Sequence, residues 1–186
     1  MYSMKSFATV FLISLIYLVF ISDISGQTKD DFLLRYTTGK EMEENSCGYI
    51  NSKGDTIIPS GKYIFCYTDT FKNFAIVMDT SFRCIGIDRD ENELYEVKWF
   101  DNGPDPISEG LFRIMKNDKT GYANTQGEIV IAPQFECTTP FKNGKARVSY
   151  HCQLVKEGEY TRMKSKRWIY IDKSGNTIKS EKNKNE

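Results

Sequence analysis

The chain has 186 residues, and its 25 lysine and arginine side chains balance its 25 aspartate and glutamate side chains. A chain of this length is expected to form about one domain. Because the formal net charge is zero, the composition argues against the strong electrostatic attraction on which binding to nucleic acid or to anionic lipid depends. We therefore expect no nucleic-acid partner.

The first 26 residues have the pattern of a secretory signal peptide. Lys5 precedes an apolar run over residues 7–21, and small or polar residues follow up to Gly26. A short basic start, an apolar stretch and a small-residue exit are typical of such peptides. We expect residues 1–26 to be removed and the protein to be secreted or periplasmic, with no membrane span in the mature chain. An uncleaved membrane anchor is the less favoured alternative, because the run is shorter than the roughly 20 residues of a spanning helix.

Four segments repeat one short pattern after a lead-in, residues 27–46, that is too polar to assign. The predicted hairpins start at positions 48, 85, 121 and 169, which are 37, 36 and 48 residues apart. Self-similarity at a nearly fixed period is typical of small units that bury their apolar faces against neighbours. The sequence therefore predicts an all-β fold over residues 47–178. We expect an array of about four β-hairpin repeat units, either solenoid-like or propeller-like.

Each copy predicts a strand, a polar turn and a second strand. An asparagine or aspartate opens the turn, and in three copies a glycine follows three positions later, as Gly54, Gly127 and Gly175. A glycine suits this place in a hairpin loop because it adopts positive φ without steric cost. The second copy combines Asp88 with Glu91 at the glycine position. We therefore expect a longer or distorted turn there.

The segment after the hairpin also repeats. Residues 65–77 and 135–148 each place two phenylalanines six residues apart, and a Lys-Asn turn then leads into an alternating strand. The last interval between hairpins is longer because residues 151–166 insert a polar excursion. The stretch over residues 156–167 is mostly basic, and we interpret it as a solvated hairpin loop. Residues 179–186 carry no apolar side chain, and this composition predicts a disordered charged tail.

The cysteines suggest up to two disulfides in an oxidising compartment, with one thiol left over. They are Cys47, Cys66, Cys84, Cys137 and Cys152. Cys47 and Cys84 hold the same position in neighbouring units, so their side chains come close enough to pair if the units stack in register. Cys137 and Cys152 flank one predicted strand pair and are the other candidate couple. Free, half-buried structural thiols are the alternative. No metal site is expected, because there is no Cys-x-x-Cys pair and the only histidine, His151, is interpreted as a polar strand residue.

These residues resemble the WG-repeat family, bacterial β-rich repeats named for a Trp-Gly pair that opens a Gly-Tyr-Ile-Asp-x-x-Gly hairpin. The match is nearly complete over residues 121–148, good over 48–59, and interrupted in 168–175 by Ile169 at the glycine position. The tryptophan position is held by Cys47, Cys84, Thr120 and Trp168. The resemblance covers about residues 47–178 and implies an all-β array without catalytic residues, because the family has no established common activity. It also implies a surface for binding or scaffolding.

No combination of residues predicts catalysis or cofactor binding, so we expect no catalytic residue and no cofactor. Our leading hypothesis is an exported binding or interaction module whose partner is a protein or a glycan of the cell envelope. The alternative is an envelope hydrolase that uses acidic residues of the 88–109 region. These are Asp88, Asp90, Asp101, Asp105 and Glu109. The many aromatic residues of the first half are expected mainly in the core, because short β units need large side chains to fill them.

Overall fold

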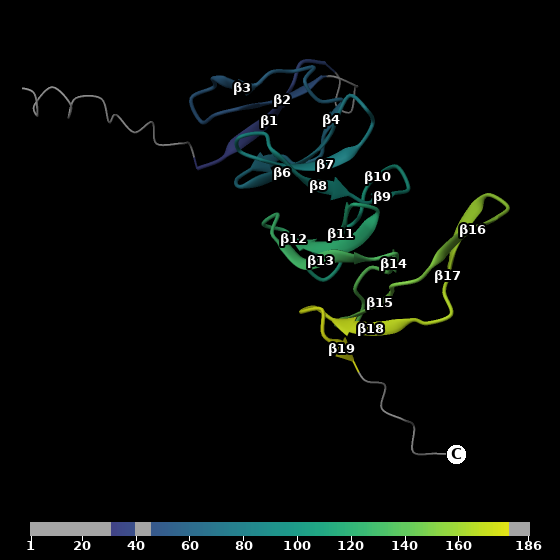
Figure 1. Cartoon of the computed structure of the whole chain (residues 1–186). Helices are drawn as coiled ribbons and strands as arrows, with labels where there is room; N and C mark the ends of the chain where they lie inside the picture. Colours follow the sequence, from purple (N-terminus) through teal and green to yellow (C-terminus); the bar gives the residue numbers. More distant parts are fainter. Residues whose placement is uncertain (1–30, 40–45, 179–186) are drawn as a thin grey trace, which may run out of the picture. The chain divides into compact units, whose positions relative to one another are not determined.

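The structure, a computed structural model, describes residues 31–39 and 46–178. Within these ranges every regular element is a β-strand and the strand pairs are antiparallel. This confirms the predicted all-β fold (Figure 1). The predicted signal peptide, part of the lead-in and the charged tail lie outside the described residues.

Three sheets contain most of the strands. The first has the order β3 (Thr56–Ile58), β2 (Cys47–Ile50), β1 (Leu33–Thr37) and β5 (Thr70–Phe71). The second has the order β13 (Ile129–Phe135), β12 (Lys119–Asn124), β11 (Leu111–Lys116), β8 (Glu93–Val97), β7 (Cys84–Asp88), β6 (Phe74–Met78) and β4 (Phe65–Cys66). The third has the order β14 (Cys137–Thr138), β15 (Lys145–Ser149), β18 (Ile169–Asp172) and β19 (Thr177–Ile178). Two-stranded ribbons are formed by β9 (Trp99–Phe100) with β10 (Gly103–Pro104) and by β16 (Gln153–Glu157) with β17 (Tyr160–Lys164).

Strand β1 lies inside the lead-in that the sequence left unassigned. It pairs with β2 from Leu34, opposite Ile50, to Thr37, opposite Cys47, and its first residues pair with β5. The side chain of Leu33 is buried and that of Leu34 is exposed, which is the alternation of a half-buried strand. This part of the lead-in therefore completes the first sheet.

The four repeated segments form the hairpins β2–β3, β7–β8, β12–β13 and β18–β19, and their turns share one geometry. The side-chain oxygen of the opening Asn or Asp accepts the backbone N–H groups two and four residues later. The N–H three residues later donates to the carbonyl of the opening residue. Gly54, Gly127 and Gly175 hold that third position at φ of 89°, 86° and 84°, as the turn pattern requires.

The turn at Asp88 is neither longer nor distorted, so that expectation was wrong. It keeps the same hydrogen bonds, with Glu91 at a φ of 61° in the place of the glycine. A left-handed conformation costs a non-glycine residue about 1–2 kcal/mol. The Tyr63 hydroxyl donates to Glu91 Oε2 at 3.1 Å, and Lys62 Nζ lies 2.7 Å from the same oxygen. These two contacts offset part of the conformational cost. A fifth turn of this kind joins β6 to β7, with Phe82 at a φ of 61°.

A side-chain pair closes each of these five turns. The opening residue and the residue four positions later always combine one donor and one acceptor, 2.8–3.2 Å apart. The pairs are Asn51–Asp55, Asp79–Arg83, Asp88–Asn92, Asn124–Glu128 and Asp172–Asn176. One oxygen of the opening side chain is already occupied by backbone N–H groups. The other terminal group of the opening side chain therefore determines which residue fits four positions later, because an amide NH₂ needs an acceptor and a carboxylate oxygen needs a donor.

Two other glycines are required because the partner strand comes very close. A Cβ atom on Gly48 would lie 2.4 Å from the carbonyl oxygen of Ile58, and one on Gly121 would lie 2.3 Å from that of Ile131. Both hairpins have register shifts beside these positions, as in a β-bulge. In the last hairpin the described pairing begins at Tyr170. Ile169 holds the equivalent position in the last hairpin, and its partly buried side chain packs against the core cluster that contains Tyr122 and Phe141.

The cores of the first and third repeat units contain the same aromatic pair. Tyr49 meets Phe71 edge-on at 5.3 Å, and Tyr122 meets Phe141 edge-on at 4.8 Å. Each tyrosine hydroxyl donates to a threonine carbonyl at 2.8 Å, which satisfies the polar group inside the core. Other aromatic residues expected in the core are exposed instead. These are Phe82, Trp99 and Phe100.

The turn of each later hairpin lies against the unit before it. Glu91 accepts from Tyr63 of the first unit. The carbonyl of Gly127 accepts from Tyr95 Oη of the second unit at 2.9 Å, and a Cβ on Gly175 would lie 3.5 Å from Ile131 of the third. Neighbouring units thus bury their faces against one another, as a repeat array requires.

Two disulfides form, and one of them is not the predicted pair. Cys47 bonds to Cys66, with Cα atoms 6.0 Å apart, so the expected Cys47–Cys84 pairing is wrong. The reason is that Cys47 and Cys66 share one core cluster, whereas Cys84 packs in another with Tyr95 and Val97. Cys137 and Cys152, the other expected couple, are bonded, with Cα atoms 5.8 Å apart. Cys84 is a free thiol, and burial raises its pKa to about 12.

Candidate binding surface

An open hollow of about 850 Å³ lies at the base of the β16–β17 ribbon. It is lined by Glu136, His151, Cys152, Gln153 and residues 163–168. Arg167 and His151 also line a second hollow of about 290 Å³ beside Tyr150. Our placement of His151 on a strand was wrong, because β15 ends at Ser149. The Ser149 hydroxyl donates to the His151 carbonyl at 2.8 Å and accepts the His151 N–H at 3.2 Å, which turns the chain there.

The basic excursion of the sequence forms the β16–β17 ribbon, labelled in Figure 1. Glu157 lies 3.2 Å from Arg162 Nε and 3.0 Å from Lys164 Nζ. Leu154 and Tyr160 are 68% and 79% exposed. The ribbon pairs with no other described strand, so it projects charged and apolar groups into solvent beside the hollow.

The outer face of β15 and β18 carries two contacts between a cation and an aromatic ring. Lys145 Nζ lies 5.4 Å from the centre of the Tyr170 ring, and the Arg147 guanidinium lies 4.4 Å from the centre of the Trp168 ring. Arg147 is directly opposite Tyr170 in the strand register. The alternate residues of these strands, such as Val148, face the core. Trp168 joins this face to the larger hollow.

We define the basic surface as Lys145, Arg147, Lys166, Arg167, Trp168 and Tyr170. Within the described ranges, none of its four cations forms an ion pair with a carboxylate. Asp172 is opposite Lys145, but the N–H of Asn176 holds its carboxylate in the turn and lowers its pKa. Glu136 accepts the Cys152 N–H at 2.7 Å, which lowers its pKa, and binds Lys119 at 3.0 Å. The basic surface therefore retains a net positive charge.

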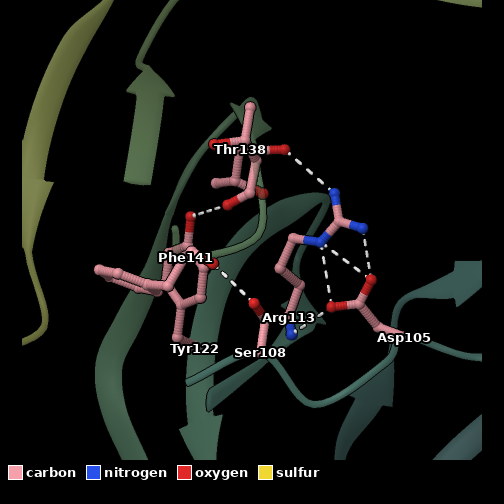
Figure 2. A network of polar contacts seen from close by, with 7 residues as sticks. Asp105, Ser108, Arg113, Tyr122, Thr138 and Phe141 are labelled. Carbon is pink, nitrogen blue, oxygen red and sulfur yellow. Dashed lines mark hydrogen bonds and ion pairs between the residues drawn. The ribbon is translucent and has the colours of Figure 1, made fainter. Parts of the chain in front are cut away.

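A buried ion pair anchors β14, the strand that pairs with β15 (Figure 2). Asp105 is 3% exposed and Arg113, in β11, is 5% exposed. Arg113 Nε donates to both carboxylate oxygens at 3.0 Å, its Nη2 also binds the carboxylate, and its backbone N–H donates to Oδ2 at 2.8 Å. Its Nη1 donates to the Thr138 carbonyl at 3.1 Å, and Ser108 Oγ donates to the Phe141 carbonyl at 2.6 Å. The network thus fixes β14 and the approach to β15, which carries Lys145 and Arg147.

The structure does not bring the five acidic residues of the 88–109 region together. Asp88 closes a turn, and Asp105 binds Arg113. Glu109 accepts the Gly144 N–H at 3.0 Å, which lowers its pKa, and pairs with Lys173. Asp90 and Asp101 are exposed, and none of the five lines either hollow. The arrangement provides no converging carboxylates at these hollows.

Two further properties of the described residues bear on function. Residues 31–39 and 46–178 hold no group of three or more His, Cys, Asp or Glu side chains placed to bind a metal ion. The same ranges include no helix that is long and apolar enough to cross a membrane.

Antiparallel hairpins with a shared turn, the turn of each later hairpin resting on the preceding unit, define a β-repeat protein. Residues 121–150 match the family model described as WG containing repeat, which confirms the resemblance to the WG-repeat family. The matched segment spans β12 to β15 and thus includes Lys145 and Arg147, whereas Trp168 lies after it. No curated protein and no solved structure matches the chain. The sequence did not indicate this surface because its cations come from two segments about 20 residues apart, and only the pairing of β15 with β18 in the folded sheet joins them.

Proposed function

We propose that the protein is an exported β-repeat binding module that recognises a protein or a glycan of the cell envelope. The observation that carries the proposal is the basic surface, which combines unneutralised cations, two exposed or half-exposed aromatic rings and an adjoining hollow. Aromatic and arginine side chains are enriched at binding surfaces. A β-repeat scaffold commonly presents such surfaces.

The disulfides support the proposal of export. Four of the five cysteines are bonded in two pairs, and disulfides persist in oxidising compartments such as the periplasm or the extracellular space. The apolar run over residues 7–21, after Lys5, is the segment that we propose directs export.

The rigidity around the surface supports binding. The Cys137–Cys152 bond closes the base of the β16–β17 ribbon, and Arg113, paired with the buried Asp105, donates to the Thr138 carbonyl in β14. A surface that is already ordered loses less conformational freedom when a ligand binds. The proposal includes no catalytic step, in keeping with the structural partners of Asp88, Asp105 and Glu109.

Co-purification from the native cell envelope tests the proposal. The exported protein is isolated from cells that express the full chain, and what it retains is identified by mass spectrometry and by glycan analysis. We expect one protein or glycan to be retained specifically. Recovery of a folded protein with no retained component would overturn the proposal and favour a small-molecule ligand or an unrecognised activity.

A further inference from the structure

We propose that the ligand of the basic surface is an acidic oligosaccharide, whose sugar rings carry carboxylate groups. The inference rests on the proposed function and specifies its ligand class. It concerns the face of β15 and β18 and the hollow that adjoins it, where Trp168 belongs to both.

The charge of the surface selects an anion. Lys145 and Arg147 lie on the same face of β15, two residues apart, so their positions differ by about 6.7 Å along the strand. Lys166 and Arg167 are exposed and line the hollow together with Trp168. Cations without carboxylate partners form charge-assisted hydrogen bonds with an incoming carboxylate. Two cations spaced along one face of a strand fit an anion that repeats along a chain.

The ring contacts hold two of these cations in place. Lys145 lies over Tyr170 and Arg147 over Trp168, at 5.4 Å and 4.4 Å from the ring centres. Contacts of this kind attract the cation to the face of the ring and restrict its side chain. The side chains therefore lose less freedom on binding than free lysine and arginine side chains would.

The shape of the site favours a sugar over a folded acidic protein. The hollow of about 850 Å³ is of ligand-pocket size, since such pockets hold roughly 300–1,000 Å³. A protein interface of ordinary stability instead has an apolar centre from which charges are depleted. On this surface two cations lie directly over the two aromatic rings. Sugar rings have apolar C–H faces, which stack on aromatic side chains. Their hydroxyl groups bind polar side chains, such as those of His151 and Gln153, which line the hollow.

Binding to defined polymers tests the inference on the exported protein. The acidic probe is an oligogalacturonate, the uncharged probe is an oligogalactose of the same length, and the acidic peptide probe is an oligoglutamate of the same charge. Affinities are measured by calorimetry at low and at physiological salt. We expect the oligogalacturonate to bind at least about tenfold more tightly than either other probe, because one charged hydrogen bond of about 1.5 kcal/mol corresponds to a factor of ten.

Matched variants locate the site. Lys166→Gln with Arg167→Gln removes two exposed charges of the basic surface and should weaken oligogalacturonate binding at least about tenfold. Lys53→Gln with Lys72→Gln removes two exposed charges elsewhere and should change it less than about twofold. Equal binding of all three probes, tighter binding of oligoglutamate, or equal losses in both variants would overturn the inference. If envelope co-purification still retains a protein partner, the proposed function stands and this ligand class alone is rejected.

Discussion

Replacing Gly127 by alanine should destabilise the fold much more than the same replacement of Gly54, although both glycines hold the same place in the same turn. Their φ angles are 86° and 89°, so the backbone strain of an alanine is equal at the two sites. Their surroundings differ. A Cβ on Gly127 would lie 2.4 Å from Phe74 Cγ, whereas a Cβ on Gly54 would meet nothing within 4 Å.

The two costs can be separated from this geometry. Left-handed strain costs about 1–2 kcal/mol, and the smaller freedom of alanine in the unfolded chain offsets about 0.4–1 kcal/mol of it. Gly54→Ala should therefore lose about 1 kcal/mol. Carbon atoms in contact are about 3.5–4.0 Å apart, so at Gly127 the Phe74 ring must shift by about 1 Å while it remains stacked on Phe112. Overpacking of this kind costs a further 1–3 kcal/mol or so, which gives about 2–4 kcal/mol for Gly127→Ala.

Urea unfolding followed by tryptophan fluorescence, with the disulfides intact, measures both losses. Gly54→Asn is the control, because asparagine tolerates the left-handed region and should lose less than Gly54→Ala. Equal losses for Gly54→Ala and Gly127→Ala would refute the contact between the third turn and Phe74. Absence of a loss at both sites would refute the turn geometry itself.

Three further predictions concern the turns, the buried ion pair and the free thiol. Asn124→Asp places two carboxylates together in one turn and should lower the free energy of unfolding by about 0.5–1.5 kcal/mol. Adding Glu128→Asn should restore the donor–acceptor pair and this stability. A double variant no more stable in urea than the single variant would argue against coupling between residues 124 and 128. Asp105→Ala leaves the Arg113 guanidinium buried without its anion and should lose about 3–5 kcal/mol, whereas Asp105→Leu with Arg113→Met should lose much less; a loss below about 1 kcal/mol for Asp105→Ala would contradict the buried pair. Burial raises the pKa of Cys84 from 9.0 to about 12, so the unfolded chain ionises first and stability should fall as the pH rises from about 9 to 12. Cys84→Ala should lose less stability over that range, and an unchanged pH profile would show that the thiol is not buried.

The repeats were predictable because their signals are local. Alternating strands and a turn glycine three residues after Asn or Asp need only a few neighbouring residues, and these predicted the hairpins that contain Gly54, Gly127 and Gly175. The turns at Glu91 and Phe82 have no glycine, so their positive φ was hidden from that pattern. A usable signal exists in the complementary residues at the first and fifth turn positions, as in Asp88 with Asn92.

Long-range pairing was less predictable. The Cys47–Cys84 expectation assumed that equivalent positions in neighbouring units lie side by side, but β4 brings Cys66 into the cluster of Cys47. The basic surface depends on β15 pairing with β18 across the inserted ribbon, which no local pattern indicates. Among the four repeats, only the last has a tryptophan, Trp168, at the position that names the family. Nothing in the local sequence predicts that the Arg147 guanidinium lies over its ring.

Our central proposal is that the protein binds its ligand in the cell envelope through the basic surface, and a titration of surface variants tests this directly. Retention of the exported protein on its own purified cell envelope is titrated in parallel for the wild type, for Lys166→Gln with Arg167→Gln, and for Lys53→Gln with Lys72→Gln. We predict equal affinity for the wild type and for the variant with Lys53→Gln and Lys72→Gln, and a loss of at least about tenfold for the variant with Lys166→Gln and Arg167→Gln. Equal affinity for all three proteins, or no binding by the wild type, would contradict it.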